Sequence, residues 1–210
     1  MNTLRVVLWR HGQTMWNAEH RYQGHTDIPL DETGLAQAQR AARQLAALGP
    51  QAIIASDLSR AAETAQTLGE LTGIPVRYDR RLRERSGGEW EGLTNDDIRD
   101  KYPEQWARWD PPGGESDLSV GDRFAAAVTD GVGVLPEGGT LVVASHGSAI
   151  RAGLGRLLAL PQESWRMLGP VQNCSWSVIA PAPHGWEYAG WRLLEHNAGT
   201  LPVPVLSDDR

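Results

Sequence analysis

The side chains best suited to chemistry stand directly after a short apolar run near the start of the chain. Arg10, His11 and Gly12 follow residues 4–8, a run that is typical of a buried strand. A neutral imidazole is a nucleophile, and a guanidinium binds phosphate oxygens through paired hydrogen bonds. Because the positive charge of Arg10 favours the neutral form of His11, we predict a nucleophilic histidine at a strand end, with Asn17 one short loop away.

Two further apolar runs end in residues of the same kind. Residues 52–55 lead to Ser56 and Arg60, and residues 140–145 lead to His146. The carboxyl ends of strands in an open α/β sheet are where ligands bind, and Arg60 also falls at a predicted helix start, which favours anions. Because two guanidiniums and two imidazoles are costly to bury without a counter-ion, we expect an oxyanion here. A phosphate dianion best fits the paired guanidinium contacts. Since Arg60 would otherwise be an unpaired cation, we expect its removal to spare folding.

The elements that must position these side chains alternate along the first two-thirds of the chain. Short apolar runs alternate with helical patterns, which favours the α/β class, with three α/β/α layers around a mostly parallel sheet. Two alternating segments near the end predict an antiparallel edge to this sheet. We expect strands at residues 4–8, 52–55, 75–78 and 140–145, then an antiparallel pair at 175–180 and 186–194.

The remaining segments complete the predicted organisation of residues 1–210 as a single domain. Residues 94–133 are helical but weakly apolar, and we expect them to form a helical insertion that covers the site. Residues 201–210 are expected to be a tail. For the helix that comes after residues 52–55, we expect Asp57 or Ser59 to be the N-cap residue.

Composition excludes several classes of protein. The length of 210 residues is enough to bury the core of one domain. The net charge of -6 argues against a nucleic-acid surface. The single cysteine, Cys174, excludes an internal disulfide and a cysteine-based metal cluster. The first predicted strand begins within a few residues of Met1, and no apolar run reaches membrane-spanning length. We therefore expect a cytoplasmic protein without a membrane partner, a metal or a cofactor.

A phosphoryl transfer to His11 also needs an acid, because an alkoxide is a poor leaving group. Glu84 is a candidate, in a loop rich in glycine and charge. From the residues alone, an ordinary solvated loop carboxylate is the favoured interpretation of Glu84, since Glu89 and Glu91 lie nearby. Asn17 and His146 also have non-functional interpretations. Asn17 could be an ordinary turn residue, and His146 could be a strand-end histidine whose hydrogen bonds are satisfied within the fold.

Taken together, the motifs resemble the histidine phosphatase superfamily, also called phosphoglycerate-mutase-like. The resemblance covers nearly the whole chain. It rests on Arg10-His11-Gly12-Gln13-Thr14, Asn17, Ser56-Asp57-Leu58-Ser59-Arg60-Ala61, Leu82-Arg83-Glu84 and Ser145-His146-Gly147.

The resemblance implies a metal-independent reaction through phosphohistidine on a small-molecule phosphomonoester. His11 would be the nucleophile and Glu84 the proton donor. The phosphate-binding residues would be Arg10, Asn17, Arg60 and His146. We add as candidate substrate-binding residues Gln23, Gly24, Arg85 and Gly147.

The loop that holds Glu84 separates the phosphatases of this family from the mutases. Mutases that resemble this chain carry Glu-Arg-His-Tyr-Gly, whereas this chain has Glu84-Arg85-Ser86-Gly87-Gly88. We therefore favour a phosphatase with an open mouth at Gly88 and with Trp90 facing the leaving group. Arg85 is the one residue of this loop that argues against a phosphatase, because the mutases have an arginine at the same position. The alternatives are a phosphoglycerate mutase and a non-catalytic phospholigand-binding relative.

A narrower similarity concerns the substrate. Residues 112–116 and 173–176 resemble the corresponding segments of the glucosyl-3-phosphoglycerate phosphatases. This similarity implies a sugar phosphate or a phosphoglycerate derivative as substrate. The sequence itself names neither the substrate nor the oligomeric state, and a homodimer is left open.

Overall fold

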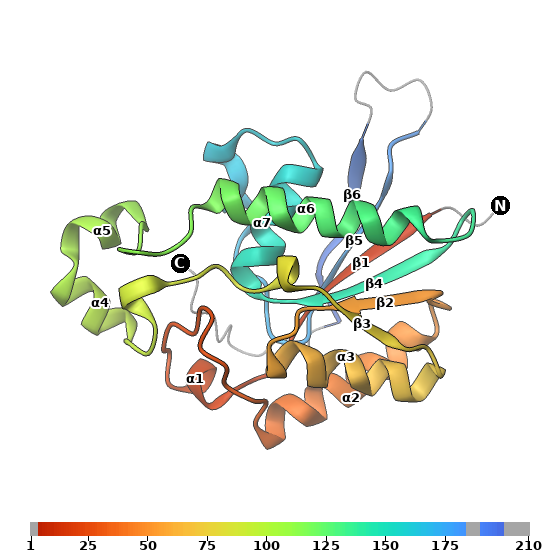
Figure 1. The fold of residues 1–210 in the computed structure, drawn as a ribbon, viewed down its shortest axis with the longest axis horizontal. Helices are drawn as coiled ribbons and strands as arrows, with labels where there is room; N and C mark the ends of the chain where they lie inside the picture. The colour runs from red at the N-terminus through yellow and green to blue at the C-terminus, as the bar shows by residue number, and fades with distance from the viewer. Residues whose placement is uncertain (1–3, 184–189, 200–210) are drawn as a thin grey trace.

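The computed structural model describes residues 4–183 and 190–199, which form a six-stranded sheet with helices on both faces (Figure 1). The strand order is β3-β2-β4-β1-β5-β6. Neighbouring strands from β3 to β1 are parallel, and β5 and β6 add an antiparallel side. The strands are β1 (Arg5–Arg10), β2 (Ala52–Ala55), β3 (Val76–Tyr78), β4 (Thr140–Ser145), β5 (Trp176–Pro181) and β6 (Trp191–Ala198).

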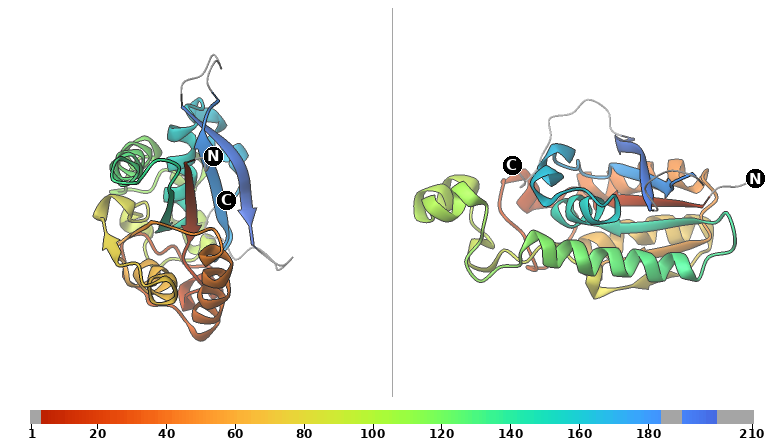
Figure 2. Two further views of the ribbon diagram at one scale, coloured as in Figure 1. Left: turned by 90° about the vertical axis from the view of Figure 1, so that its right-hand side faces the viewer. Right: turned by 90° about the horizontal axis from the view of Figure 1, so that it is seen from above.

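Two helical layers enclose the sheet, as Figures 1 and 2 show from different sides. The α-helices are α1 (Met15–Ala18), α2 (Glu32–Ala46), α3 (Ser59–Thr72), α4 (Asn95–Lys101), α5 (Pro103–Arg108), α6 (Asp117–Gly133) and α7 (Gly147–Leu157). Short 3-10 helices are η1 (Arg80–Leu82), η2 (Gly88–Trp90) and η3 (Gln162–Leu168). No helix in the described ranges combines the length and the hydrophobicity needed to cross a bilayer.

Strand β1 shows how the alternation of a strand builds two cores. Val6 and Leu8 pack into the cluster that contains the buried faces of α6 and α7. Val7 and Trp9 pack into the opposite cluster, with α2 and α3. Because β1 is buried on both faces, its four central residues, Val6–Trp9, are all apolar, and Arg10 follows where the strand ends. The predicted three-layer α/β/α fold with a mostly parallel sheet is confirmed.

The predicted insertion of residues 94–133 divides into two parts with different surroundings. Helix α6 belongs to the layer over the sheet, because Val120, Phe124 and Val128 are completely buried in its core. Only α4 and α5 extend away from the sheet, at the left of Figure 1. A weakly apolar helix is enough for α6 because it buries one face only.

At the antiparallel side, β5 pairs with both β1 and β6, so only β6 is an edge strand. The second strand of this pair begins at Trp191 and extends to Ala198, which corrects the predicted end at residue 194. The earlier part of the predicted strand, residues 186–189, and the tail of residues 201–210 lie outside the described residues.

An aromatic cluster holds α4 and α5 on the rest of the protein. Trp90 packs edge-on against Tyr22 and Trp109, with ring centroids 5.9 and 5.1 Å apart. Trp106 packs on Trp109 at 4.9 Å. The prediction that Trp90 faces a leaving group is wrong, because its side chain is fully buried in this cluster. The edge-on packing of these rings fixes their relative orientation in addition to burying apolar surface.

Candidate active site

The ends of β2, β4 and β1 lie next to one another and bring the predicted residues together. His11 N–H donates to the Ser145 carbonyl at 2.9 Å, and Ser56 N–H donates to the Ala144 carbonyl at 3.0 Å. The imidazoles of His11 and His146 are consequently neighbours, with centroids 5.1 Å apart. Both histidines are buried. The shared edge exists because the central strand β4 pairs with both of its neighbours in parallel.

His11 is held in one tautomer. Its Nδ1 donates to the carbonyl of Gly12 at 2.7 Å, and a carbonyl oxygen only accepts. Burial lowers the pKa of His11 well below 6.5, and the charges of Arg60 and Arg10 lower it further. The imidazole is therefore neutral near pH 7, with the proton on Nδ1 and a lone pair on Nε2. A neutral imidazole with a free lone pair is what nucleophilic attack requires.

His146 is oriented by Ser56. Its Nε2 lies 2.8 Å from Ser56 Oγ, whereas its buried Nδ1 has no hydrogen-bond partner within the described part of the chain. Burial lowers the pKa of His146 well below 6.5, and Arg60, His11 and Arg10 contribute in that order. When Ser56 donates to Nε2, the single proton of the neutral ring sits on Nδ1. His146 then offers an N–H donor to a bound oxyanion.

The guanidinium of Arg60 is fully buried. Its charge acts on both His11 and His146, and its hydrogen bonds hold the loop that contains Gly24 and Thr26. Its Nη1 donates to the Thr26 carbonyl at 3.0 Å and its Nη2 to the Gly24 carbonyl at 2.8 Å. Arg60 is thus engaged with protein groups and is not the unpaired cation that the sequence suggested, so we now expect its removal to destabilise the fold. Arg10 is anchored in a similar way, by Nη1 donation to the Val171 carbonyl at 2.6 Å.

The N-terminus of α3 is capped from the same loop. Leu58 occupies the N-cap position and makes no side-chain cap. Asp27 Oδ1 instead accepts from both the N–H and the hydroxyl of Ser59, each at 2.8 Å. The predicted N-cap by Asp57 or Ser59 is therefore wrong. Asp57 is engaged elsewhere, because Arg83 binds its two carboxylate oxygens at 2.7 and 2.6 Å.

Asn17 is oriented by its neighbours. Its Oδ1 accepts from Thr14 N–H at 3.2 Å in a capping box at the start of α1. Asn173 Nδ2 donates to the same oxygen at 3.2 Å and to the His11 carbonyl at 3.2 Å. Because these contacts use Oδ1, the amide nitrogen is the end of Asn17 suited to donate to a phosphoryl oxygen.

Glu84 lies against the first turn of α7, directly after His146. It is 6% exposed, so it is not an ordinary solvated loop carboxylate. Its Oε1 accepts from Ala149 N–H at 2.9 Å, and its Oε2 accepts from Ser148 N–H at 3.2 Å. These bonds are favourable, since a helix N-terminus offers unpaired N–H groups. They bring the carboxylate to the edge that holds the two histidines.

Three residues that brace Glu84 were missed by the sequence analysis. Arg123 Nη2 donates to the Glu84 carbonyl at 2.8 Å, and its guanidinium also binds Glu115 at 2.8 Å. His25 contacts the Glu84 carbonyl through Nε2 at 2.8 Å. Arg123 lies on α6, where an arginine in an amphipathic pattern has no distinguishing signal.

The candidate substrate-binding residues fall into two kinds. Gln23 is buried, accepts from Thr14 Oγ1 at 3.0 Å, and has an Nε2 without a partner among the described residues. Gly24 has a positive φ of 54° and supplies the carbonyl that binds Arg60. Gly147 begins α7 beside His146. These three lie at the cluster, and the buried donor of Gln23 points to a ligand contact.

Arg85 is engaged by the α4–α6 region instead. It is 2% exposed. Its Nε donates to the Glu115 carbonyl at 2.6 Å, and its Nη1 lies 3.0 Å from Asp117. Gly88 also packs against this region, because a Cβ at Gly88 would collide with the Pro112 carbonyl. The expected open mouth at Gly88 is therefore wrong: glycine is needed there for close packing.

An α/β sheet that brings a neutral histidine, two arginines and a buried carboxylate to one edge defines an enzyme of phosphate esters. The family model described as "Histidine phosphatase superfamily (branch 1)" matches residues 6–193. The chain belongs to this superfamily, as the resemblance of its motifs predicted. It is a metal-independent phosphoric monoester hydrolase.

Individual relatives resemble the chain over almost its full length. Glucosyl-3-phosphoglycerate phosphatase of Mycobacterium tuberculosis is 40% identical over 214 residues, which cover 94% of this chain and 96% of the relative. A probable phosphoglycerate mutase of Yersinia pestis is 36% identical, with 98% of each chain covered. The mycobacterial glucosyl-3-phosphoglycerate phosphatase solved with VO3 has a TM-score of 0.87 and 40% identity, covering 93% of this chain and 99% of that one.

Proposed function

We propose that this phosphatase acts through a phosphohistidine on His11 and hydrolyses a phosphoglycerate that carries a sugar. The observation that carries the mechanism is the fixed tautomer of a neutral His11 between Arg10 and Arg60. The substrate class is supported by the relatives named glucosyl-3-phosphoglycerate phosphatase. A cytoplasmic location and the absence of a nucleic-acid partner belong to the same proposal, the second supported by the net charge of -6.

The proposed reaction has two steps. In the first, the Nε2 lone pair of His11 attacks phosphorus, the bond to the leaving oxygen breaks, and Glu84 in its protonated form donates its proton to that oxygen. Arg10 and Arg60 bind the phosphoryl oxygens, with Asn17 and His146 as further donors. In the second step, Glu84 accepts a proton from water, and the resulting hydroxide attacks phosphorus. The bond between phosphorus and His11 Nε2 breaks, its electron pair returns to Nε2, and phosphate is released.

The surroundings of Arg85 favour hydrolysis over mutase chemistry. A mutase must hold the acid of its substrate while the phosphoryl group stays on the enzyme. Arg85 matches the mutase pattern, but its guanidinium binds Asp117 and the Glu115 carbonyl. It is therefore a positioning residue for the Glu84 loop. A non-catalytic relative is disfavoured because every expected position is filled.

Trapping the covalent intermediate tests the mechanism. Rapid quench after mixing with a phosphate-labelled monoester should give acid-labile label on the protein, and peptide mapping should find it on His11. The His11→Ala variant should trap none, whereas His20→Ala, which removes an exposed histidine, should label as the wild type does. Label that persists in His11→Ala, or that maps to another residue, refutes the assignment.

A paired assay tests hydrolysis against isomerisation. Phosphate release from glucosyl-3-phosphoglycerate is measured beside interconversion of 2- and 3-phosphoglycerate with a bisphosphoglycerate primer, on one preparation. We expect rapid release and negligible interconversion. Efficient interconversion with slow release would contradict the proposed substrate and hydrolysis while leaving the His11 chemistry intact.

A further inference from the structure

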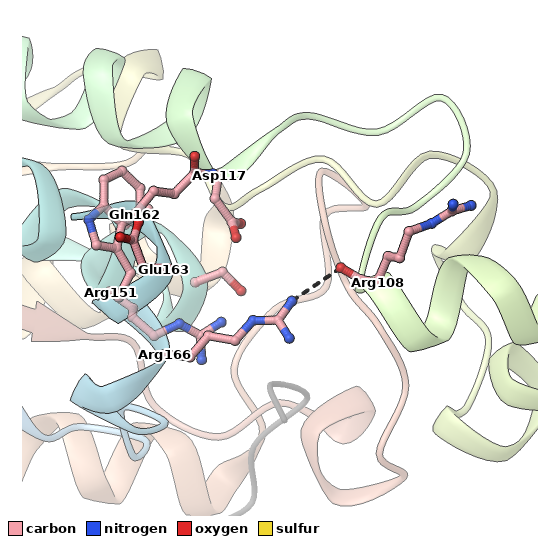
Figure 3. A pocket seen from close by; sticks show the side chains of 9 residues that line it. Arg108, Asp117, Arg151, Gln162, Glu163 and Arg166 are labelled. Carbon is pink, nitrogen blue, oxygen red and sulfur yellow. Dashed lines mark hydrogen bonds between the residues drawn. The ribbon is translucent and has the colours of Figure 1, made fainter.

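A pocket of about 360 Å³ opens beside Glu84, among the end of α5, the starts of α6 and α7, and η3 (Figure 3). The buried part of its lining includes Arg151, which is only 6% exposed, and Trp165. The exposed rim includes Gln162, Glu163 and Arg166. A pocket of this size accommodates a small organic ligand larger than a single phosphate.

The pocket adjoins the proposed proton donor. Ser148 lines it, and the N–H of Ser148 donates to Glu84 Oε2 at 3.2 Å. Arg151 lies three residues further along α7, which puts it on the same helical face. Glu84 is proposed to protonate the leaving oxygen, and its carboxylate binds a residue that lines the pocket. The group attached to that oxygen is therefore placed next to the pocket.

Arg151 and Arg166 give the pocket its capacity to bind an anion, and of its two lining carboxylates Glu163 lies on the exposed rim. Figure 3 shows Arg151 and Arg166 reaching into it from α7 and η3, while the guanidinium of Arg108 points away. The side chain of Arg166 is steadied by donation to the Arg108 carbonyl at 3.3 Å. The acidic residue Asp117 is already paired with Arg85 at 3.0 Å. A carboxylate fits guanidinium groups of this kind through charge-assisted hydrogen bonds.

We propose that this pocket is the leaving-group subsite, in which Arg151 and Arg166 bind the carboxylate of the substrate acid. Gln162 and Glu163 on the rim then bind hydroxyl groups of a polyol or sugar attached to that acid. The assignment rests on the proposed function, because it takes Glu84 as the proton donor to the leaving oxygen. In this assignment, residues of α7 and η3 determine specificity for the acid, and Arg85 only positions the Glu84 loop.

The test compares two phosphomonoesters that differ by the carboxylate, 3-phosphoglycerate and glycerol 3-phosphate. The wild type should have the higher kcat/KM on 3-phosphoglycerate. In Arg166→Gln and Arg151→Gln, the ratio of the two kcat/KM values should fall about tenfold or more, the usual effect of losing a charged hydrogen bond, with most of the change in KM for the acid. Arg156→Gln, on α7 but outside the pocket lining, is the control with the same change of charge and should keep the ratio.

The exposed position of Arg166 makes its variant informative even when Arg151→Gln fails to fold. An unchanged ratio in Arg166→Gln overturns the subsite, as does an equal fall in Arg156→Gln. For the hydroxyl contacts, a Gln162→Ala and Glu163→Ala double variant should lower kcat/KM for glucosyl-3-phosphoglycerate relative to 3-phosphoglycerate, and an unchanged ratio overturns this assignment. Failure of the proposed function is seen separately, as absence of phosphate release from all three esters by the wild type.

Discussion

Replacement of Arg60 by alanine tests the central arrangement of the site, because one guanidinium is assigned three effects. The first is on rate. Loss of a donor that stabilises transition-state charge typically costs about 10²- to 10³-fold, so kcat/KM of Arg60→Ala should fall by at least about 10²-fold. Arg60→Lys keeps the charge but loses the planar fork, and it should retain an intermediate rate.

The second effect is on the pH dependence. Attack requires neutral His11, so kcat/KM falls as the pH drops through the pKa of His11. Burial lowers that pKa most, and Arg60 is the next cause, ahead of Arg10. Removing Arg60 therefore raises the pKa of His11 towards 6.5, and the acidic limb of the profile moves to higher pH. Arg60→Lys should leave the limb close to its wild-type position.

The third effect is on stability. Arg60→Ala removes charged hydrogen bonds to the Thr26 and Gly24 carbonyls at 3.0 and 2.8 Å. At about 1.5–3 kcal/mol each, the loss is about 3–6 kcal/mol in the free energy of unfolding, measured by urea denaturation. The control is Arg156→Ala, which removes an exposed arginine. Near-wild-type kcat/KM in Arg60→Ala, or a slow variant whose acidic limb does not move, would refute the reasoning.

Three further outcomes are expected from the same contacts. Stability should decline as the pH falls below 6.5, because the lowered pKa values of His11 and His146 let the unfolded chain bind protons first. The decline is up to about 1.4 kcal/mol per pH unit for each histidine; denaturation at pH 7.5 and 5.5 measures it, and an equal decline in His146→Asn would contradict the contribution of His146. Ser56→Ala removes the partner of His146 Nε2 and should lower kcat/KM about tenfold, whereas Ser59→Ala, with its hydroxyl on Asp27, should not; equal losses would show that the effect is on the fold. Activity should survive EDTA, since no cluster of three metal-ligating side chains occurs within the described residues; loss restored by a divalent cation would place the enzyme in another mechanistic class.

The sequence determined the chemistry at the strand ends, because that information is local. A buried strand is a short apolar run, and the residues directly after the run must lie at the end of the strand. Arg10, His11 and His146 were therefore predicted at the correct edge, and the order of the motifs identified the family. The limits of this local reasoning appear at Trp90 and Gly88. Their surroundings come from residues more than ten positions away, which hydrophobic periodicity does not specify.

Only the tertiary structure decided which groups orient and support these residues. Arg60 binds carbonyls 34 and 36 residues earlier in the chain, and Arg123 binds the carbonyl of Glu84 39 residues earlier. Both are arginines in helical patterns, and the pattern tells which face is buried but not which backbone passes beside it. The pocket beside Glu84 likewise depends on how α5, α6, α7 and η3 converge. Strand order and helix packing set these neighbours, because hydrogen bonding and burial act between whichever groups the fold brings within a few ångströms.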